Sequence, residues 1–145
     1  MYKKILIPID GTECAEQSLD YARTFTGKDG TAEVVLLWVT ESNPQITDIG
    51  GLLSERWFCD AQAKAQADIK KYVSQIADKL KKDGIAVKSI ITRGRVADVI
   101  TNYAKNGQAD LIVMSSHRRS GILRWVMGSV ADKVLRRSAV PVLIV

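Results

Sequence analysis

Residues 3–11 read KKILIPIDG and decide the fold class, because an uninterrupted apolar run ends at once in a polar turn. Aliphatic residues without polar alternation are typical of a strand that is covered on both faces. Thr12, directly after this stretch, is a good helix N-cap, and Glu13 favours the positive end of a helix dipole. We therefore expect a buried strand that passes directly into a helix.

The same alternation recurs along the chain. Four further apolar runs lie at residues 34–39, 85–91, 111–114 and 140–145, separated by segments with the helical period. Helical connections require parallel pairing and right-handed crossovers. The sequence therefore predicts one domain over residues 1–145, an α/β fold in which a three-layer, doubly wound sandwich surrounds a five-stranded, mainly parallel sheet of order 3-2-1-4-5.

Each expected helix has a stripe of residues that should face the core. The four stripes are Ala15, Ser18, Leu19, Ala22 and Phe25; Phe58, Ala61, Ala65, Ile69, Tyr72, Ile76 and Leu80; Val96, Ile100 and Tyr103; and Val130, Val134 and Leu135. Gly84 and Gly107 should end the second and third helices, and the last should begin near Ser129. The irregular segment from Thr40 to Leu53 is expected to be a mobile flap.

Composition argues against several classes of protein. The chain is 46% hydrophobic and 26% charged, with 10 Gly and 3 Pro, which is unlike disordered, collagen-like or coiled-coil sequences. No apolar run approaches the roughly 18 residues of a membrane span, and the start does not resemble a signal peptide. Two cysteines, Cys14 and Cys59, cannot form a disulfide framework and are expected to be small packing residues. We expect a cytoplasmic protein without a membrane partner.

The net charge of +5 is concentrated near the C-terminus. The 20 residues from Arg118 to Arg137 hold six basic side chains and one acid, whereas the other 125 residues balance at 15 basic to 15 acidic. A local excess of this kind indicates either an anionic ligand or a solvated face. Aromatic residues among these cations are limited to Trp125, so nucleic acid is the weaker choice of anion.

A ligand crevice is expected where the strand order reverses, beyond the carboxyl ends of the first and fourth strands. These ends lie at residues 8–11 and 114–118, and the loop after the fourth strand leads to Gly128-Ser129 at a helix start. Unpaired N–H groups and the dipole make a helix N-terminus suitable for phosphate. Ser129 either caps this helix or donates its hydroxyl to an oxyanion.

Each of these signals also has a purely structural interpretation. Gly128-Ser129 is a common helix start, and Asp10 serves equally well to cap the first helix or to hold a ribose hydroxyl. His117 has no acid or nucleophile nearby in sequence, which favours loop stabilisation over catalysis. For Trp38, aromatic packing is the default and base stacking the alternative.

Three segments, residues 3–11, 110–117 and 128–145, closely resemble the universal stress protein family. The resemblance covers the chain in order. It implies a five-stranded, Rossmann-like fold of the adenine nucleotide alpha hydrolase type and a homodimer. It also implies ATP or AMP in the crevice, with Mg²⁺ accompanying ATP.

Carried over by position, the resemblance implies a set of nucleotide contacts. Those near the base and ribose are Pro8, Ile9, Asp10, Val39, Gly94, Met114 and Ser115. Those near the phosphates are Arg118, Gly128, Ser129 and Val130, and His117 lies on the same loop. The family pattern is a glycine, two residues, a second glycine, nine residues and then Gly-Ser or Gly-Thr; here Ser115 and Arg118 replace the two earlier glycines. Arg118 either fills space meant for phosphate or turns its guanidinium toward it.

These features favour a nucleotide-responsive regulatory protein of the stress response over an enzyme. The sequence has no Walker A motif and no catalytic cluster of carboxylates or metal ligands. Slow ATP hydrolysis stays open as an alternative. Another alternative is a ligand-free dimeric scaffold, since the wholly apolar strand Val140 to Val145 is expected at a sheet edge, where it invites pairing across a two-fold axis. Protein partners are not identified by any motif.

Overall fold

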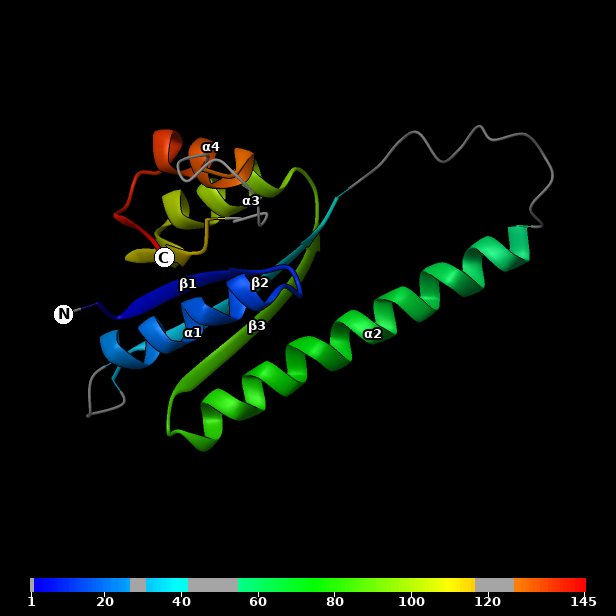
Figure 1. The fold of residues 1–145 in the computed structure, drawn as a ribbon, viewed down its shortest axis with the longest axis horizontal. Helices are drawn as coiled ribbons and strands as arrows, with labels where there is room; N and C mark the ends of the chain where they lie inside the picture. Colours follow the sequence, from blue (N-terminus) through cyan, green and yellow to red (C-terminus); the bar gives the residue numbers. More distant parts are fainter. Residues whose placement is uncertain (1, 27–30, 42–54, 117–126) are drawn as a thin grey trace, which may run out of the picture.

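The computed structural model describes residues 2–26, 31–41, 55–116 and 127–145. Its elements are β1 (Lys4–Ile9), α1 (Glu13–Phe25), β2 (Glu33–Thr40), α2 (Glu55–Lys82), β3 (Ala86–Arg93), α3 (Val96–Tyr103), β4 (Leu111–Met114), α4 (Ser129–Arg137) and β5 (Val142–Ile144). The strands form one sheet of order β3-β2-β1-β4-β5, and every neighbouring pair is parallel (Figure 1). This confirms the predicted fold class and strand order.

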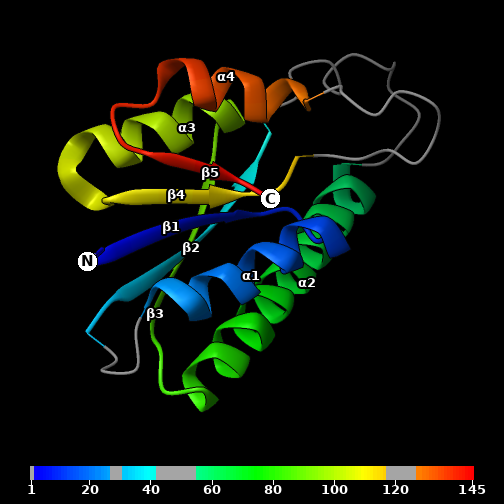
Figure 2. The same cartoon turned by 60° about the vertical axis from the view of Figure 1, so that its left-hand side comes forward.

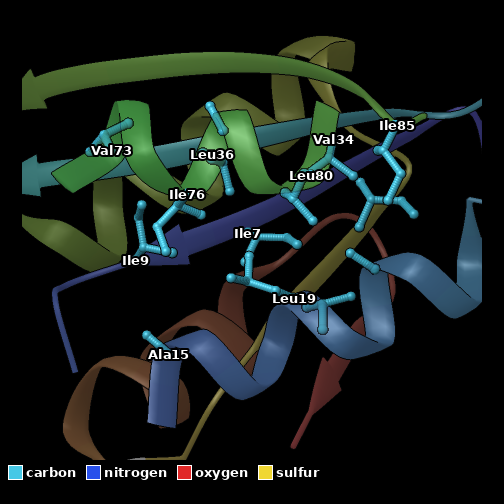
Figure 3. Packing of buried hydrophobic residues seen from close by; sticks show 14 of the residues in the cluster. Ile7, Ile9, Ala15, Leu19, Val34, Leu36, Val73, Ile76, Leu80 and Ile85 are labelled. Atoms are coloured by element: carbon cyan, nitrogen blue, oxygen red, sulfur yellow. The ribbon is translucent and has the colours of Figure 1, made fainter. Parts of the chain in front are cut away.

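Helices α1 and α2 cover one face of the sheet, and α3 and α4 cover the other, as Figure 2 shows. Alternate residues of β1 therefore enter different cores: Ile5 and Ile7 pack on the side of α1 and α2, whereas Leu6 packs on the side of α3 and α4. We call these the α1–α2 core and the α3–α4 core; Figure 3 shows part of the α1–α2 core. Because β1, β2 and β4 lie between both cores, their sequences are continuously apolar.

The helix boundaries follow local signals in the sequence. Thr12 caps α1, its hydroxyl oxygen accepting the Ala15 N–H at 3.2 Å. Gly84, at φ +79°, ends α2, and the N–H groups of Gly84 and Ile85 bond back to Lys81 and Leu80 as in a Schellman motif. Beyond α3 the chain continues as a wider π-helical turn, Ala104–Gln108, in which Gly107 adopts φ +71°.

Three predictions about burial were wrong in part. β3 is not covered on both faces: it is an edge strand, and Lys88, Ser89 and Ile91 are exposed. Residues 60–68 of α2, including Ala61 and Ala65, are also exposed, because this half of the helix extends beyond the sheet (Figure 1). Leu135 on α4 is 45% exposed rather than inward.

The other core predictions were confirmed among the described residues. Ala15, Ser18, Leu19 and Ala22 of α1 are buried, as are Ile76, Leu80, Ile100 and Val134, with Phe25, Ile69, Tyr72, Val96, Tyr103 and Val130 packed against them. The expected flap falls mostly on residues 42–54, outside the described residues, as does the side chain of Phe58.

Candidate functional site

The carboxyl end of β1 is built as a tight polar turn. The Asp10 carboxylate accepts hydrogen bonds from the Thr12 N–H, at 3.0 Å, and from the Thr12 hydroxyl, at 2.7 Å. Gly11 adopts φ +82°, and a Cβ there would lie 3.3 Å from the Trp38 ring. The helix cap is therefore Thr12, as predicted, and Asp10 orients that cap while remaining exposed at the surface.

Trp38, at the carboxyl end of β2, belongs to the α1–α2 core. Its ring meets Tyr72 of α2 edge to face, with ring centroids 5.7 Å apart. The Tyr72 hydroxyl donates to a Glu16 carboxylate oxygen at 3.1 Å. Burial first, and then the hydrogen bond and charge of Glu16, raise the pKa of Tyr72 to about 12. This packing favours the structural interpretation of Trp38 over base stacking.

The predicted base contacts divide between the two faces of the sheet. Val39 and Met114 pack in the α3–α4 core, and Pro8 shares that face with Leu6 by strand alternation. Ile9 is 4% exposed and packs in the α1–α2 core, so its side chain is committed to that core. The face covered by α3 and α4 is therefore where the predicted apolar contacts gather.

A hollow of about 280 Å³ lies on this side of the sheet, between the first turns of α3 and α4. Its lining includes three residues predicted from the sequence, namely Gly94, Ser129 and Val130. The remaining lining residues are Glu41, Arg95, Val96, Ala97, Asp98, Lys133 and Arg137. Residues that are far apart in the chain, at the ends of β2 and β3 and the start of α4, therefore meet at one site.

Gly94 sets the entry of the chain into α3. Its φ of +153° is a region that side chains rarely adopt, and a Cβ there would lie 2.9 Å from Cγ2 of Val99. Its N–H donates to the Thr40 carbonyl at 3.0 Å. Glycine at this position therefore joins the end of β2 to the start of α3 and brings both to the wall of the hollow.

Charged side chains line the hollow with opposing signs. Asp98 accepts a hydrogen bond from Arg137 at 3.1 Å and lies 3.5 Å from Nε of Arg95. These contacts connect α4 with the first turn of α3. With Lys133 and Glu41 included, three cations face two carboxylates, and the lining carries a net positive charge.

The first turns of both helices reach this hollow. α4 begins with Gly128 as N-cap, which provides no side-chain cap bond, so Ser129 is the first helical residue and not the cap. α3 likewise has no side-chain cap at Arg95. Because the first N–H groups of a helix lack partners within it, both turns present donors and positive dipole ends.

The end of β4 is joined to the last residue of the chain. Val145 N–H donates to the Met114 carbonyl at 3.0 Å, and Ser116 N–H donates to the Val145 carbonyl at 3.1 Å. Ser115 is half-buried between these bonds. His117 and Arg118, which the sequence analysis also assigned to the site, lie outside the described residues, so neither interpretation of Arg118 is tested.

Several lining residues were missed from the sequence. Lys133 and Arg137 belonged to the counted basic excess but were not assigned to the site, and Arg95 follows Gly94 directly. The available signal was helical spacing, since positions 129, 130, 133 and 137 lie on one side of α4. Within the described ranges no group of three or more His, Cys, Asp or Glu residues is placed to hold a metal ion.

The fold and site define a doubly wound, Rossmann-like α/β protein with a basic hollow at the carboxyl edge of its sheet. Comparison with known proteins gives a narrower class. The sequence profile of the universal stress protein family matches residues 1–145, and the chain belongs to that family.

Relatives and solved structures agree with this assignment. Universal stress protein MJ0577 of Methanocaldococcus jannaschii is 30% identical over all of this chain and 95% of its own. The solved MJ0577 structure has a TM-score of 0.83 at 32% identity, covering 100% of this chain and 96% of that one.

Two more distant structures show the same fold. A universal stress protein solved in complex with cAMP has a TM-score of 0.68 at 21% identity, covering 99% of this chain and 96% of its own. A family protein from Arabidopsis thaliana, solved with AMP bound, has a TM-score of 0.71 at 16% identity, covering 99% and 90% respectively. Among the residues that the structure describes, no helix is long and apolar enough to cross a membrane.

Proposed function

We propose that this protein is a cytoplasmic regulatory protein that binds an adenine nucleotide, ATP or AMP, in the crevice between the strand ends and the α3–α4 hollow. One observation carries the proposal: Gly94, Ser129 and Val130, predicted as ligand contacts from separate parts of the sequence, line a single hollow. Val39 and Met114 belong to the α3–α4 core, which lies on the same face of the sheet.

The residues present fit the parts of a nucleotide. Val39 and Pro8, which are only partly buried, supply apolar surface for a base, whereas Met114 is enclosed in the α3–α4 core; the first turns of α3 and α4 supply N–H donors for phosphate. Mg²⁺ would accompany ATP as part of the ligand. The relatives solved with cAMP and AMP support an adenine nucleotide as the class of ligand.

Regulation is a better match than catalysis. The family is generally regulatory. The carboxylates in the hollow, Asp98 and Glu41, lie among cations, and Asp98 already contacts two arginines. Binding energy gained on nucleotide contacts can instead favour one conformation of the chain and so alter what a partner recognises.

Equilibrium binding tests this proposal. Isothermal titration of the purified protein with ATP and AMP, with and without Mg²⁺, should give saturable binding. Nucleotide released by denaturing freshly purified protein and separated by chromatography should be adenine-based. The absence of a binding signal at millimolar ATP, together with no released nucleotide, would remove the proposal.

A ligand-free homodimeric scaffold is the second candidate function. It is favoured by β5, which lies at an edge of the sheet and carries no charged side chain from Val142 to Ile144. The scaffold function requires that the protein form a dimer in the absence of nucleotide, whereas the regulatory function requires that it bind a nucleotide.

A further inference from the structure

We propose that the hollow between α3 and α4 is a subsite for the terminal phosphates of a nucleoside triphosphate, formed by Arg95, Lys133 and Arg137. This inference rests on the proposed function and deepens it, because it predicts that the protein prefers ATP to AMP. None of these three cations belongs to the set of contacts that the family pattern implied.

The size of the hollow indicates that it receives part of a nucleotide. Pockets that enclose a whole drug-sized ligand have volumes of about 300–1,000 Å³. The hollow, at about 280 Å³, lies below that range, and the predicted base contacts Val39 and Met114 are not among its lining residues. If the base is held at the strand ends, the hollow is available for the phosphate end of the nucleotide.

The path from base to hollow is continuous along the chain. Val39 precedes Thr40, whose carbonyl accepts the Gly94 N–H at 3.0 Å, and Gly94 is followed at once by Arg95. On the opposite wall, Ser129 and Val130 begin α4, and Lys133 follows one turn later. A phosphate chain that passes the first turn of α4 therefore moves toward Lys133.

The charge of the hollow suits an anionic ligand. Three cations face two carboxylates, so the lining has a net charge of +1. Arg95 and Arg137 both form ion pairs with Asp98. The side chain of Arg95 is 87% exposed, that of Arg137 60% and that of Asp98 39%. Ion pairs this exposed are weak, so both guanidinium groups can change partner at small cost.

Lys133 is the cation best placed for a ligand. Its side chain is exposed, and the described part of the chain gives it no ion-pair partner. Arg136, three positions along α4, differs in two respects: its Nε donates to Asp132 at 2.9 Å, and its side chain does not line the hollow. Arg136 is therefore a matched control on the same helix.

The test measures affinity for ATP, ADP, AMP and adenosine by isothermal titration in four proteins: the parent, Lys133→Gln, Asp98→Asn and Arg136→Gln. We expect the affinity of the parent protein for ATP to be at least about tenfold higher than its affinity for AMP, because ATP gains a charge-assisted contact in the hollow. Lys133→Gln should lose about three- to tenfold in ATP affinity and leave AMP unchanged. Asp98→Asn, which removes a negative charge from the hollow, should bind ATP more tightly.

The variants separate a subsite from a structural or general charge effect. If Asp98 has only a structural role, Asp98→Asn should bind ATP more weakly than the parent. The subsite predicts the opposite, tighter binding of ATP. Equal weakening of ATP binding by Lys133→Gln and Arg136→Gln would show a general charge effect and overturn the subsite. Circular dichroism and thermal unfolding show whether each variant is folded before its affinity is compared.

The failure of this inference differs from the failure of the proposed function. If ATP and AMP bind equally and Lys133→Gln changes neither affinity, the subsite is wrong and nucleotide binding stands. If no nucleotide binds, the proposed function is wrong. Tripolyphosphate, titrated separately, shows whether the phosphates must belong to a nucleotide. If it binds as tightly as ATP, the hollow is a site for free polyphosphate, and the proposal that it binds the phosphates of a nucleotide is wrong.

Discussion

Gly94 connects backbone conformation to the candidate site more directly than any other described residue. Its φ of +153° lies in a region that is almost exclusive to glycine, and there is no space for a Cβ beside Val99. The same residue bonds to Thr40 and lines the hollow. Its conformation therefore determines where α3 begins.

Replacing this glycine should be costly. Gly94→Ala should lower the free energy of unfolding by about 2–6 kcal/mol, because backbone strain and overpacking each contribute about 1–3 kcal/mol. Gly84→Ala is the control, since Gly84 adopts φ +79° in open space and should cost only about 1–2 kcal/mol. Urea denaturation measures both losses; equal losses in the two variants would contradict the role of the Val99 contact.

Single residues were predicted well where one local rule decides them. Thr12 caps α1 and Gly84 ends α2, as expected from the sequence, whereas α3 ends at Tyr103 and Gly107 lies in the π-helical turn that follows. Lys133 was counted in the basic excess but was not assigned to the site. Its position in the hollow becomes apparent only with Arg95 and Asp98, which line the hollow from the start of α3. Capping was one of two roles considered for Ser129, yet Gly128 takes the cap position, since sequence signals locate a helix start only to within a residue or two.

α1, α2 and β2 are connected by one cluster near the carboxyl end of the sheet. Trp38 meets Tyr72, and Tyr72 donates to Glu16. Burial and the neighbouring carboxylate hold the pKa of Tyr72 at about 12, above its ordinary 10.0. The protonated hydroxyl is therefore favoured by folding.

This cluster predicts a dependence of stability on alkaline pH. Because the pKa is higher in the folded state, the stabilisation is complete below about pH 10 and is lost as the pH rises toward 12. Tyr72→Phe keeps the ring and removes the titrating group, so its unfolding free energy should fall less steeply over that interval. Chemical denaturation at several pH values compares the two proteins; parallel slopes would show that Tyr72 is not coupled to folding.

Elements as a whole were predicted by periodicity, and burial was predicted less well. Ala61 and Ala65 continue the stripe of α2, but alanine has little apolar surface, so its spacing indicates a helix without showing that the helix is covered. β3 was placed at an edge by the predicted strand order, as observed, but its apolar residues Ile90 and Ile91 did not show how much of the strand is exposed. Leu135 was expected inward together with Val130 and Val134, but it is 45% exposed, whereas its neighbour Val134 is fully buried.

The whole molecule has two sheet edges of different character. β3 exposes Lys88 and Arg93, and charges of this kind discourage pairing with another chain. β5 is short, half-buried and uncharged from Val142 to Ile144. The β5 edge is therefore the one at which a second copy of the chain is expected.

We predict a homodimer through this edge. Light scattering during gel filtration at micromolar concentration should give twice the chain mass of 16.0 kDa. Val145→Lys should shift the mass toward the monomer, because it places a charge beside the pairing edge. Ile91→Lys, on the opposite edge, is the control and should leave the mass unchanged; a parent protein with the monomer mass would contradict the prediction.

The hydrogen bonds of Val145 also bear on how the protein should be prepared for these measurements. The last residue is fixed to Met114 and Ser116 at the carboxyl edge of the sheet, the edge that carries the candidate crevice. A purification tag fused there would emerge beside the ligand. Because parallel strands all begin at the opposite edge, a tag placed ahead of β1 keeps the affinity handle away from the nucleotide being titrated.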